Sequence, residues 1–472
     1  WLELPSGARH ALRRAHTGGR GMKERTGDNR APQAHPAQPE TPLVLHTEFA
    51  AAFDSAERGS AFLEIDRATG EARNLPASEV DLRRERYRLQ REAGSILGPR
   101  HRINYCHMAI GHQKENAEVR QHGERYSLGG LAVCGNVWAC PVCSSRVAER
   151  RADEIRQAMA WAKKRGLHVH LVTLTTRHNA MQSAAELVAS ISEAWRYVTS
   201  HRRYKRPGGP RSRPGLRSFY GFSGYIKALE VTHGGHGWHP HFHLVMFTRK
   251  KMGESARAEL SALWRDAIQA QGYEPPSDAH GVDIQDGSKA GEYINKYGDD
   301  GELLQRKTGK KKGQPVSWDA ADELTKANIK KGRGQNRKPF QLLQDAADGC
   351  EESARLYREY VAAFKGRSQL QWSPGLRSAV GLDDVSDEEL AEQAGDSCLV
   401  LAIPRRLWQP FAAAVRRRTG GASRGGLLKL AERGGLDAVA RYLAGFARIS
   451  PGQARQLIER ATAAEQLPDL AA

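Results

Sequence analysis

The chain has 472 residues, which is enough for two to four domains, and 39% of them are hydrophobic. Its 72 lysines and arginines exceed its 54 aspartates and glutamates, and the resulting net charge of +18 favours a nucleic acid as partner. The sequence has neither a run of about 18 apolar residues nor an amino-terminal export signal, so we expect a cytoplasmic protein without a membrane span. It also lacks a GxxxxGK[ST] phosphate loop, which argues against an ATPase motor.

Composition divides the chain into five parts. We expect a disordered basic tail at 1–45, because this segment is rich in Gly, Pro, Arg, His and Thr without a repeat. The parts predicted after it are a helical lead-in of uncertain role at 46–98, a cysteine-rich module at 99–150, an α+β region at 151–382, and a linker with small helices at 383–472. Ser386 is the expected N-cap of a helix in that linker.

Four of the six cysteines lie in the segment 99–150, and two of them form a C-x-x-C knuckle. In a reducing cytoplasm such spacing favours a structural zinc ion with four protein ligands over a disulfide. The predicted zinc ligands are Cys106, Cys134, Cys140 and Cys143. His107 or His122 is an alternative to the most distant cysteine, and a redox pair or simply buried thiols are alternatives to a metal site.

The region that follows alternates helical and strand patterns. The expected elements are a helix at 152–165, a strand at 168–176, a helix at 187–200, a basic loop at 201–216, a hairpin of strands 224–232 and 237–247, a helix at 253–271, a strand at 281–285 and a helix from about 288. This order predicts an α+β fold in which helices flank a central antiparallel sheet. After residue 399 we expect small helices that are broken by glycines.

The second strand of the hairpin, Gly237–Phe247, contains three alternating histidines. Because side chains alternate along a strand, His239, His241 and His243 project from one face. The glycine-rich turn before them closes the hairpin so that Glu230 lies opposite His241 on that face. Two imidazoles and a carboxylate form a metal site, whereas a solvated histidine-rich edge strand is the alternative interpretation.

The pair His241-Phe-His243, followed by aliphatic residues, resembles the His-hydrophobe-His motif of the HUH endonucleases. The surrounding sequence resembles the rolling-circle replication initiators of bacterial plasmids, particularly those of high-GC actinobacteria. Leu171–Arg177 resembles the first motif of these proteins, Gly291–Tyr297 the third, and Gly366–Arg377 a tract near the end of their nuclease region. The resemblance covers roughly residues 100–385 and implies an HUH nuclease fold with a ferredoxin-like palm.

The third motif of this family carries the catalytic tyrosine, which the resemblance places at Tyr293. Lys296 follows one helical turn later, where its ammonium lowers the pKa of the phenol and steadies developing negative charge. Tyr297 offers a second tyrosine, but the lysine that two-tyrosine initiators carry three places beyond it is Asp300 here. We therefore expect Tyr293 to be the principal nucleophile, with a role for Glu292 or Tyr297 in termination left open.

The resemblance implies a magnesium or manganese ion at the histidine strand, while ligand preference alone leans toward zinc or manganese. The candidate ligands of this ion are Glu230, His239, His241 and His243. Between residues 301 and 340 basic residues far outnumber acidic ones, which predicts contacts with DNA phosphates. The predicted DNA-binding residues are Lys310, Lys311, Lys312, Lys330, Lys331 and Arg333.

Three functional hypotheses follow from these motifs. The leading one is a plasmid rolling-circle initiator that nicks origin DNA, keeps the 5′ phosphate on tyrosine, leaves a 3′ hydroxyl primer and relies on a host helicase. A single-tyrosine HUH transposase or relaxase shares this chemistry but acts on another substrate. A zinc-stabilised DNA-binding repressor without nuclease activity is the alternative from a different class, and it leaves the metal ligands and the tyrosine–lysine pair unused.

Overall fold

The computed structural model describes residues 82–123, 125–287, 336–393 and 397–466, and the antiparallel strands β1 (Phe62–Ile65) and β2 (Ala72–Leu75). The predicted tail at 1–45, the tyrosine motif with Tyr293, Lys296 and Tyr297, and the six predicted DNA-binding residues lie outside the described residues. Within the described part of the chain, each helix is too short or too polar to cross a membrane.

A five-stranded antiparallel sheet is the centre of the fold, with strand order β8-β5-β7-β6-β9. Its strands are β5 (His168–Thr175), β6 (Phe222–Gly234), β7 (Gly237–Thr248), β8 (Val282–Asp286) and β9 (Leu370–Trp372). The predicted hairpin is confirmed, because β6 and β7 pair with Glu230 opposite His241. The predicted α+β fold with a central antiparallel sheet is confirmed as well.

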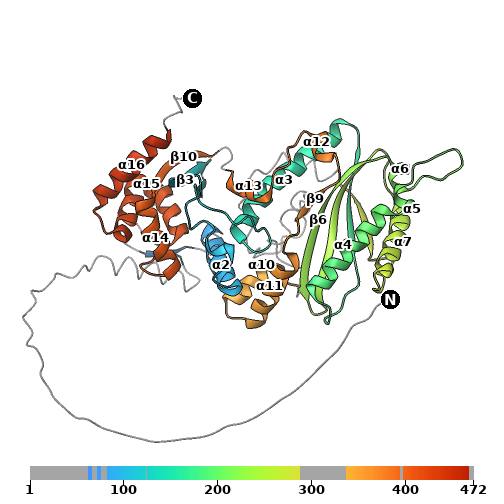
Figure 1. Cartoon of the computed structure of the whole chain (residues 1–472), viewed down its shortest axis with the longest axis horizontal. Coiled ribbons are helices and arrows are strands. Elements are labelled where there is room, and N and C mark those ends of the chain that lie inside the picture. The colour runs from blue at the N-terminus through green and yellow to red at the C-terminus, as the bar shows by residue number, and fades with distance from the viewer. Residues whose placement is uncertain are drawn as a thin grey trace, which may run out of the picture. The chain divides into compact units, whose positions relative to one another are not determined.

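Different helices cover the two faces of this sheet (Figure 1). On one face Leu244 and Met246 of β7 are buried with α4 (Ala184–Ser200) and α7 (Glu254–Ala270), which lie side by side. On the other face Val245 and Phe247 are buried with α3 (Pro141–Lys164). Both faces are thus apolar near the end of β7, and the histidines earlier in this strand share the face of Val245.

The helix predicted at 152–165 begins earlier than expected, at Pro141, so the knuckle cysteines lie at the start of α3. Proline suits the first turn of a helix because its missing N–H is unpaired there in any case. The prediction of a loop throughout 201–216 is wrong, because His201 caps a short helix within this segment. The short helices in and after this segment are α5 (Arg202–Lys205) and α6 (Leu216–Tyr220).

A second sheet has the order β10-β3-β4, and it joins the cysteine-rich segment to the carboxyl-terminal part of the chain. Its strands are β3 (Asn116–His122), β4 (Arg125–Gly129) and β10 (Cys398–Pro404). The helices expected after residue 399 are present, but the strand β10 before them was not expected. The aliphatic run Leu399–Ile403 favours a strand, and its pairing with β3 overrides the helical pattern around it.

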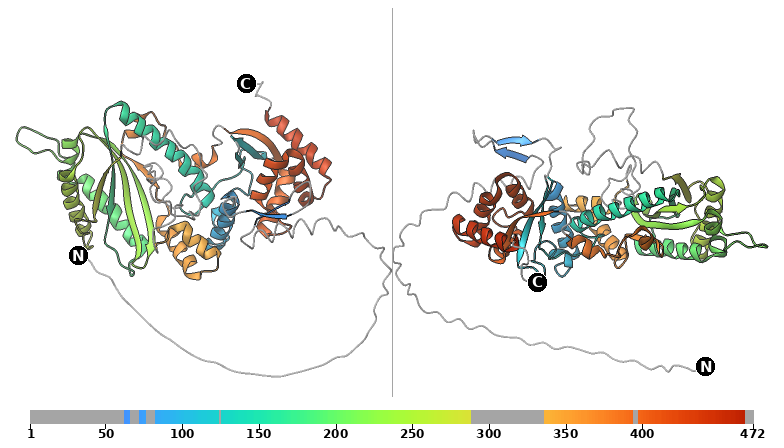
Figure 2. Two further views of the ribbon diagram at one scale, coloured as in Figure 1. Left: turned by 180° about the vertical axis from the view of Figure 1, so that it is seen from behind. Right: turned by 90° about the horizontal axis from the view of Figure 1, so that it is seen from above.

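Three helices pack beside this second sheet and share its core (Figures 1 and 2). They are α14 (Arg405–Arg417), α15 (Arg424–Ala447) and α16 (Pro451–Gln466). Gly435 interrupts α15 with φ 54° and ψ −147°, which agrees with the predicted glycine-broken helices.

The remaining helices pack against one another, against α3 and α4, and against β6. They are α2 (Leu82–Leu97), the 3-10 helix η2 (Arg102–Asn104), α10 (Pro339–Ala347), α11 (Glu351–Phe364), α12 (Leu376–Val380) and α13 (Asp387–Glu392). Ser386 caps α13 as predicted, because its side chain accepts the Glu389 N–H while the Glu389 carboxylate accepts the Ser386 N–H.

Candidate functional site

Glu230, His241 and His243 converge on one face of the β6–β7 hairpin. The Oε2 atom of Glu230 lies 3.4 Å from Nε2 of His241 and 3.3 Å from Nε2 of His243. One ligand atom from each residue lies within 4.8 Å of the others, although these residues come from two strands. The hairpin register produces this arrangement, because it sets the carboxylate directly across from the first imidazole.

Hydrogen bonds to the other ring nitrogens orient both imidazoles. Thr173 lies opposite His243 in β5, and its Oγ1 is 3.1 Å from Nδ1 of that histidine. Nδ1 of His241 lies 3.3 Å from the carbonyl oxygen of His239. Both Nε2 atoms therefore point toward Glu230, which is how outer-shell partners orient histidines that bind a metal.

The Glu230 carboxylate is buried, with 2% of its surface exposed. Its Oε1 pairs with the ammonium of Lys338, whereas Oε2 accepts no hydrogen bond from the part of the chain that the structure describes. A buried carboxylate oxygen without a donor is costly, and a divalent cation between it and the two Nε2 atoms would remove that cost. The three side chains therefore fit a metal ion.

The charge of the Glu230 carboxyl is favoured by its neighbours. Burial alone raises its pKa, but the imidazoles of His241 and His243 and the ammonium of Lys338 more than offset this effect. The pKa of Glu230 consequently lies well below its usual range, so the group is a carboxylate at neutral pH. A carboxylate rather than a carboxylic acid is the form that binds a cation.

His239, the fourth predicted ligand, is outside this group of ligand atoms, although its ring centre lies 5.2 Å from that of His241. Its Nδ1 is 3.1 Å from Nδ1 of His178, which lies in the loop after β5. Burial, with the neighbouring imidazoles, lowers the pKa of His239 to about 3, so this ring is neutral at physiological pH. The structure thus brings three of the four predicted ligands together. The neutral imidazoles of His239 and His178 lie next to this group.

Lys338 was not predicted at this site. It is the N-cap residue of α10, it is 7% exposed, and the backbone of its neighbour Arg337 pairs with His233 in β6. In the sequence Lys338 resembles the other lysines and arginines of its basic segment. Only its contact with Glu230 in the folded protein distinguishes it from them. Lys338 places a positive charge on the side of Glu230 that faces away from the two imidazoles.

Replacement of Lys338 by methionine should destabilise the protein, because it leaves the Glu230 carboxylate buried without its cation. Loss of one partner of a buried ion pair costs about 3–5 kcal/mol. The melting temperature, measured without added Mg²⁺ or Mn²⁺, should fall for Lys338→Met and largely recover when Glu230→Gln is added, because a neutral amide needs no counter-charge. An unchanged melting temperature of the single variant would show that the pair does not stabilise the fold.

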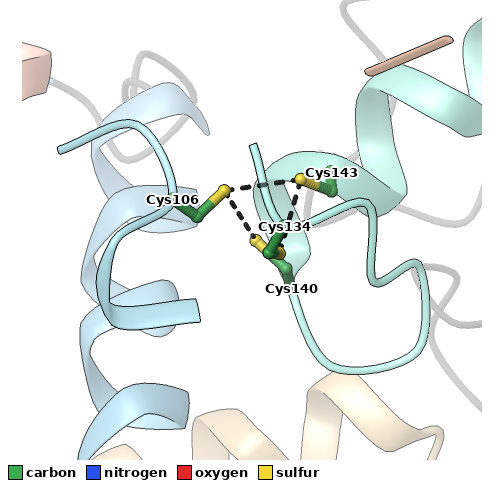
Figure 3. A group of neighbouring side chains, drawn as sticks. All are labelled: Cys106, Cys134, Cys140 and Cys143. Atoms are coloured by element: carbon green, nitrogen blue, oxygen red, sulfur yellow. Dashed lines mark hydrogen bonds between the residues drawn. The ribbon is translucent and has the colours of Figure 1, made fainter. Parts of the chain in front are cut away.

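The four predicted zinc ligands also converge (Figure 3). They are buried free thiols, and the Sγ–Sγ distances are 3.4 Å for Cys106–Cys143, 3.7 Å for Cys134–Cys143 and 3.8 Å for Cys106–Cys140. Tetrahedral zinc with Zn–S bonds of about 2.3 Å requires S···S edges of about 3.8 Å. The cluster therefore has the dimensions of a four-cysteine zinc site, and these sulfur atoms are too far apart for a disulfide.

The two histidine alternatives lie outside the cluster. Nε2 of His107 is 3.3 Å from a guanidinium nitrogen of Arg146, and burial lowers the pKa of His107 to about 3. His122 lies at the exposed end of β3. His107 adopts a left-handed backbone conformation, with φ 54°, directly after Cys106. The structure thus assembles four sulfur ligands without a histidine.

Two polar side chains from outside the cysteine-rich segment contact this cluster, and neither was predicted. Gln90 of α2 donates from Nε2 to Sγ of Cys140 over 3.3 Å and to the carbonyl oxygen of Cys106 over 3.2 Å. Arg424 of α15 donates to the same Cys106 carbonyl over 3.2 Å. The helices α2 and α15, which are far apart in the sequence, therefore both contact the four-cysteine cluster.

Residues 130–351 match a family described as "Replication protein", and this span includes the Glu230–His241–His243 group and three of the clustered cysteines. The chain is 31% identical over 331 residues to "Protein rep" of Streptomyces lividans, which covers 58% of this chain and 68% of that protein. It is 30% identical over 199 residues to "Neomycin resistance protein" of Streptomyces cyanogenus, which covers 34% of this chain and 45% of that protein. No solved structure matches. The resemblance to replication initiators is confirmed at the level of the family, and the chain belongs to the replication protein family.

Proposed function

We propose that this protein initiates rolling-circle replication of a plasmid by nicking one strand of the origin. Membership of the replication protein family supports the role in replication, and the relative named "Protein rep" supports an initiator. The observation that carries the nicking chemistry is the position of Glu230 Oε2, which is buried, lacks a hydrogen bond among the described residues and faces Nε2 of both His241 and His243.

These three side chains would bind a Mg²⁺ or Mn²⁺ ion, which when present polarises the scissile phosphate. The carboxylate provides the charged ligand, and the two imidazoles provide neutral ones. Thr173 prevents rotation of the His243 ring and so keeps Nε2 directed at the site. Lys338 pairs with Oε1 of Glu230, so Oε2 is the carboxylate oxygen that would bind the ion.

The reaction we propose is a transesterification by Tyr293. Its phenolate oxygen attacks the phosphorus, and the bond from phosphorus to the 3′ oxygen breaks. The 3′ oxygen takes up a proton and leaves as a hydroxyl primer, while the 5′ phosphate stays on the tyrosine. Lys296 stabilises the phenolate and the charge on the phosphate, and the basic residues 310–333 bind the flanking DNA.

The remaining components follow from this reaction. Origin DNA is the substrate, and a host helicase separates the strands. Action on a plasmid places the protein in the cytoplasm. There the reduced thiols of the cysteine cluster are available for a structural zinc ion, separate from the ion of the nuclease site.

The test uses supercoiled plasmid and labelled single-stranded origin DNA, with and without Mn²⁺, and it detects a protein–DNA adduct that survives SDS. A Mn²⁺-dependent adduct and nicked plasmid are expected. Binding to the origin without an adduct would favour the repressor instead. Cleavage of transposon ends or of a transfer origin, with the plasmid replication origin left intact, would favour the transposase or relaxase.

Replacement of Tyr293 by phenylalanine should eliminate the adduct, whereas Tyr297→Phe should at most impair strand closure. Only Tyr293 has a lysine three residues later, whereas Tyr297 would meet Asp300, whose negative charge raises the pKa of a phenol and repels DNA. Peptide mapping of the DNA-linked fragment identifies the nucleophile. An adduct on Tyr297 would reverse this assignment and leave the family membership unaffected.

A further inference from the structure

Arg424, the first residue of α15, is an arginine buried beside the cysteine cluster, with 3% of its surface exposed. Its Nη1 donates to the carbonyl oxygens of Cys106 and His107, each over 3.2 Å. The left-handed conformation of His107 turns these two successive carbonyls toward the same guanidinium. The guanidinium carbon also lies 4.2 Å from the centre of the Tyr87 ring, so the charge is enclosed on several sides.

No carboxylate forms an ion pair with Arg424 among the residues that the structure describes, and its Nε has no hydrogen-bond partner there. The charged or titratable groups that interact with it are Tyr87, Arg91, Cys106, His107 and Cys140. An arginine cannot lose its proton under ordinary conditions, so a buried guanidinium needs a nearby negative charge. Of these groups, the thiols of Cys106 and Cys140 can provide the negative charge without deprotonation of Tyr87.

Four thiolates around a divalent zinc ion carry a net charge of −2, whereas four protonated thiols carry none. We propose that Arg424 is the counter-charge of the metal-loaded cysteine cluster, and that the ion thereby holds the first turn of α15 against the cysteine-rich segment. This inference rests on the proposed zinc ion. Without the ion, the Arg424 charge keeps only two carbonyl oxygens and the Tyr87 ring as partners among the described residues, which weakens the attachment of the first turn of α15.

The contacts around Arg424 can transmit such a change. A Cβ atom added at Gly425 would lie 3.1 Å from Cα of Arg84, so the start of α15 packs closely against α2. Further along α15, Glu432 pairs with Arg83 of α2. Because α15 shares its core with β10, α14 and α16, movement of its first turn loosens the segment as a whole.

The test compares zinc affinity in three variants of the full chain, by competition with a chromogenic chelator. Arg424→Gln keeps donors for the two carbonyls but removes the charge, and Arg424→Lys keeps the charge. Ser423→Ala is the matched control, because it removes the side-chain cap of the same helix turn without changing any charge. Changes outside the ligand set of a metal site typically cost 10–100-fold in affinity.

We expect Arg424→Gln to weaken zinc binding about 10–100-fold, with Arg424→Lys much closer to the wild type and Ser423→Ala unchanged. Hydrogen exchange in residues 424–431 should be faster in zinc-stripped wild type and in zinc-loaded Arg424→Gln. Equal zinc affinity of Arg424→Gln and the wild type would overturn the inference while leaving the zinc site intact. A wild-type chain without zinc at its four clustered cysteines would instead overturn the proposed zinc ion itself.

Discussion

Alanine at His241 or His243 should abolish plasmid nicking while duplex-origin binding stays within a few-fold of the wild type. Each substitution removes one of two imidazoles that face Glu230 Oε2 at 3.3–3.4 Å, and two ligands do not bind a divalent ion firmly. Lewis-acid stabilisation contributes several kcal/mol, so the loss in rate should be on the order of a thousand-fold. Nicking is measured by conversion of supercoiled to open-circular plasmid at saturating Mn²⁺.

The control for this prediction is His178→Ala. His178 extends the row of imidazoles through its contact with His239, but it does not approach the Glu230 carboxylate group. Its removal should change the nicking rate far less than the removal of His241. Normal cleavage by both His241→Ala and His243→Ala would show that nicking does not depend on this metal site.

Double replacement of Cys140 and Cys143 by serine should unfold the cysteine-rich segment, and chelation of zinc should do the same to the wild type. Structural zinc contributes about 10–16 kcal/mol of apparent binding energy in small zinc-binding domains, and that energy is folding energy. Both cysteines are buried at the start of α3, so the loss also affects the helix that covers the first sheet. Differential scanning calorimetry and light scattering report the lower melting temperature and the aggregation.

Cys350 and Cys398 offer a matched control, because both are exposed and lie outside the cluster. The Cys350→Ser and Cys398→Ser double variant carries the same chemical change and should melt like the wild type. If the Cys140 and Cys143 variant also kept its melting temperature, the four thiols would be packed side chains without a metal.

Local patterns were sufficient to predict the parts of the structure that form within a few tens of residues. Alternation of side chains in β7 and the glycine-rich turn before it specify which face each histidine occupies, and the turn sets the register that brings Glu230 to His241. The convergence of the four cysteines was likewise predictable from residue type and spacing, because a C-x-x-C knuckle with further cysteines nearby is typical of a four-thiolate metal site.

Contacts between distant segments could not be predicted in this way. β10 was missed because its short aliphatic run is ambiguous by itself, and its partner β3 lies far away in the sequence. Lys338 and Arg424 were missed for the same reason. Each looks like a solvated cation in a basic chain, and each acquires its role only when folding places it against Glu230 or the cysteine cluster.

The pairing of β10 with β3 has a consequence for how the protein is made. Cys398 and Gln121, which are partners in this ladder, are 277 residues apart, so β3 leaves the ribosome long before its neighbour exists. At 5–20 residues per second, roughly, that interval lasts tens of seconds. Until β10 is made, β3 pairs with β4 but its other edge has no partner strand, whereas the first sheet is complete from β5 to β8 well before residue 398 is added. Chains that end before residue 398 should therefore keep a formed hairpin at the nuclease site yet aggregate through the exposed edge of β3.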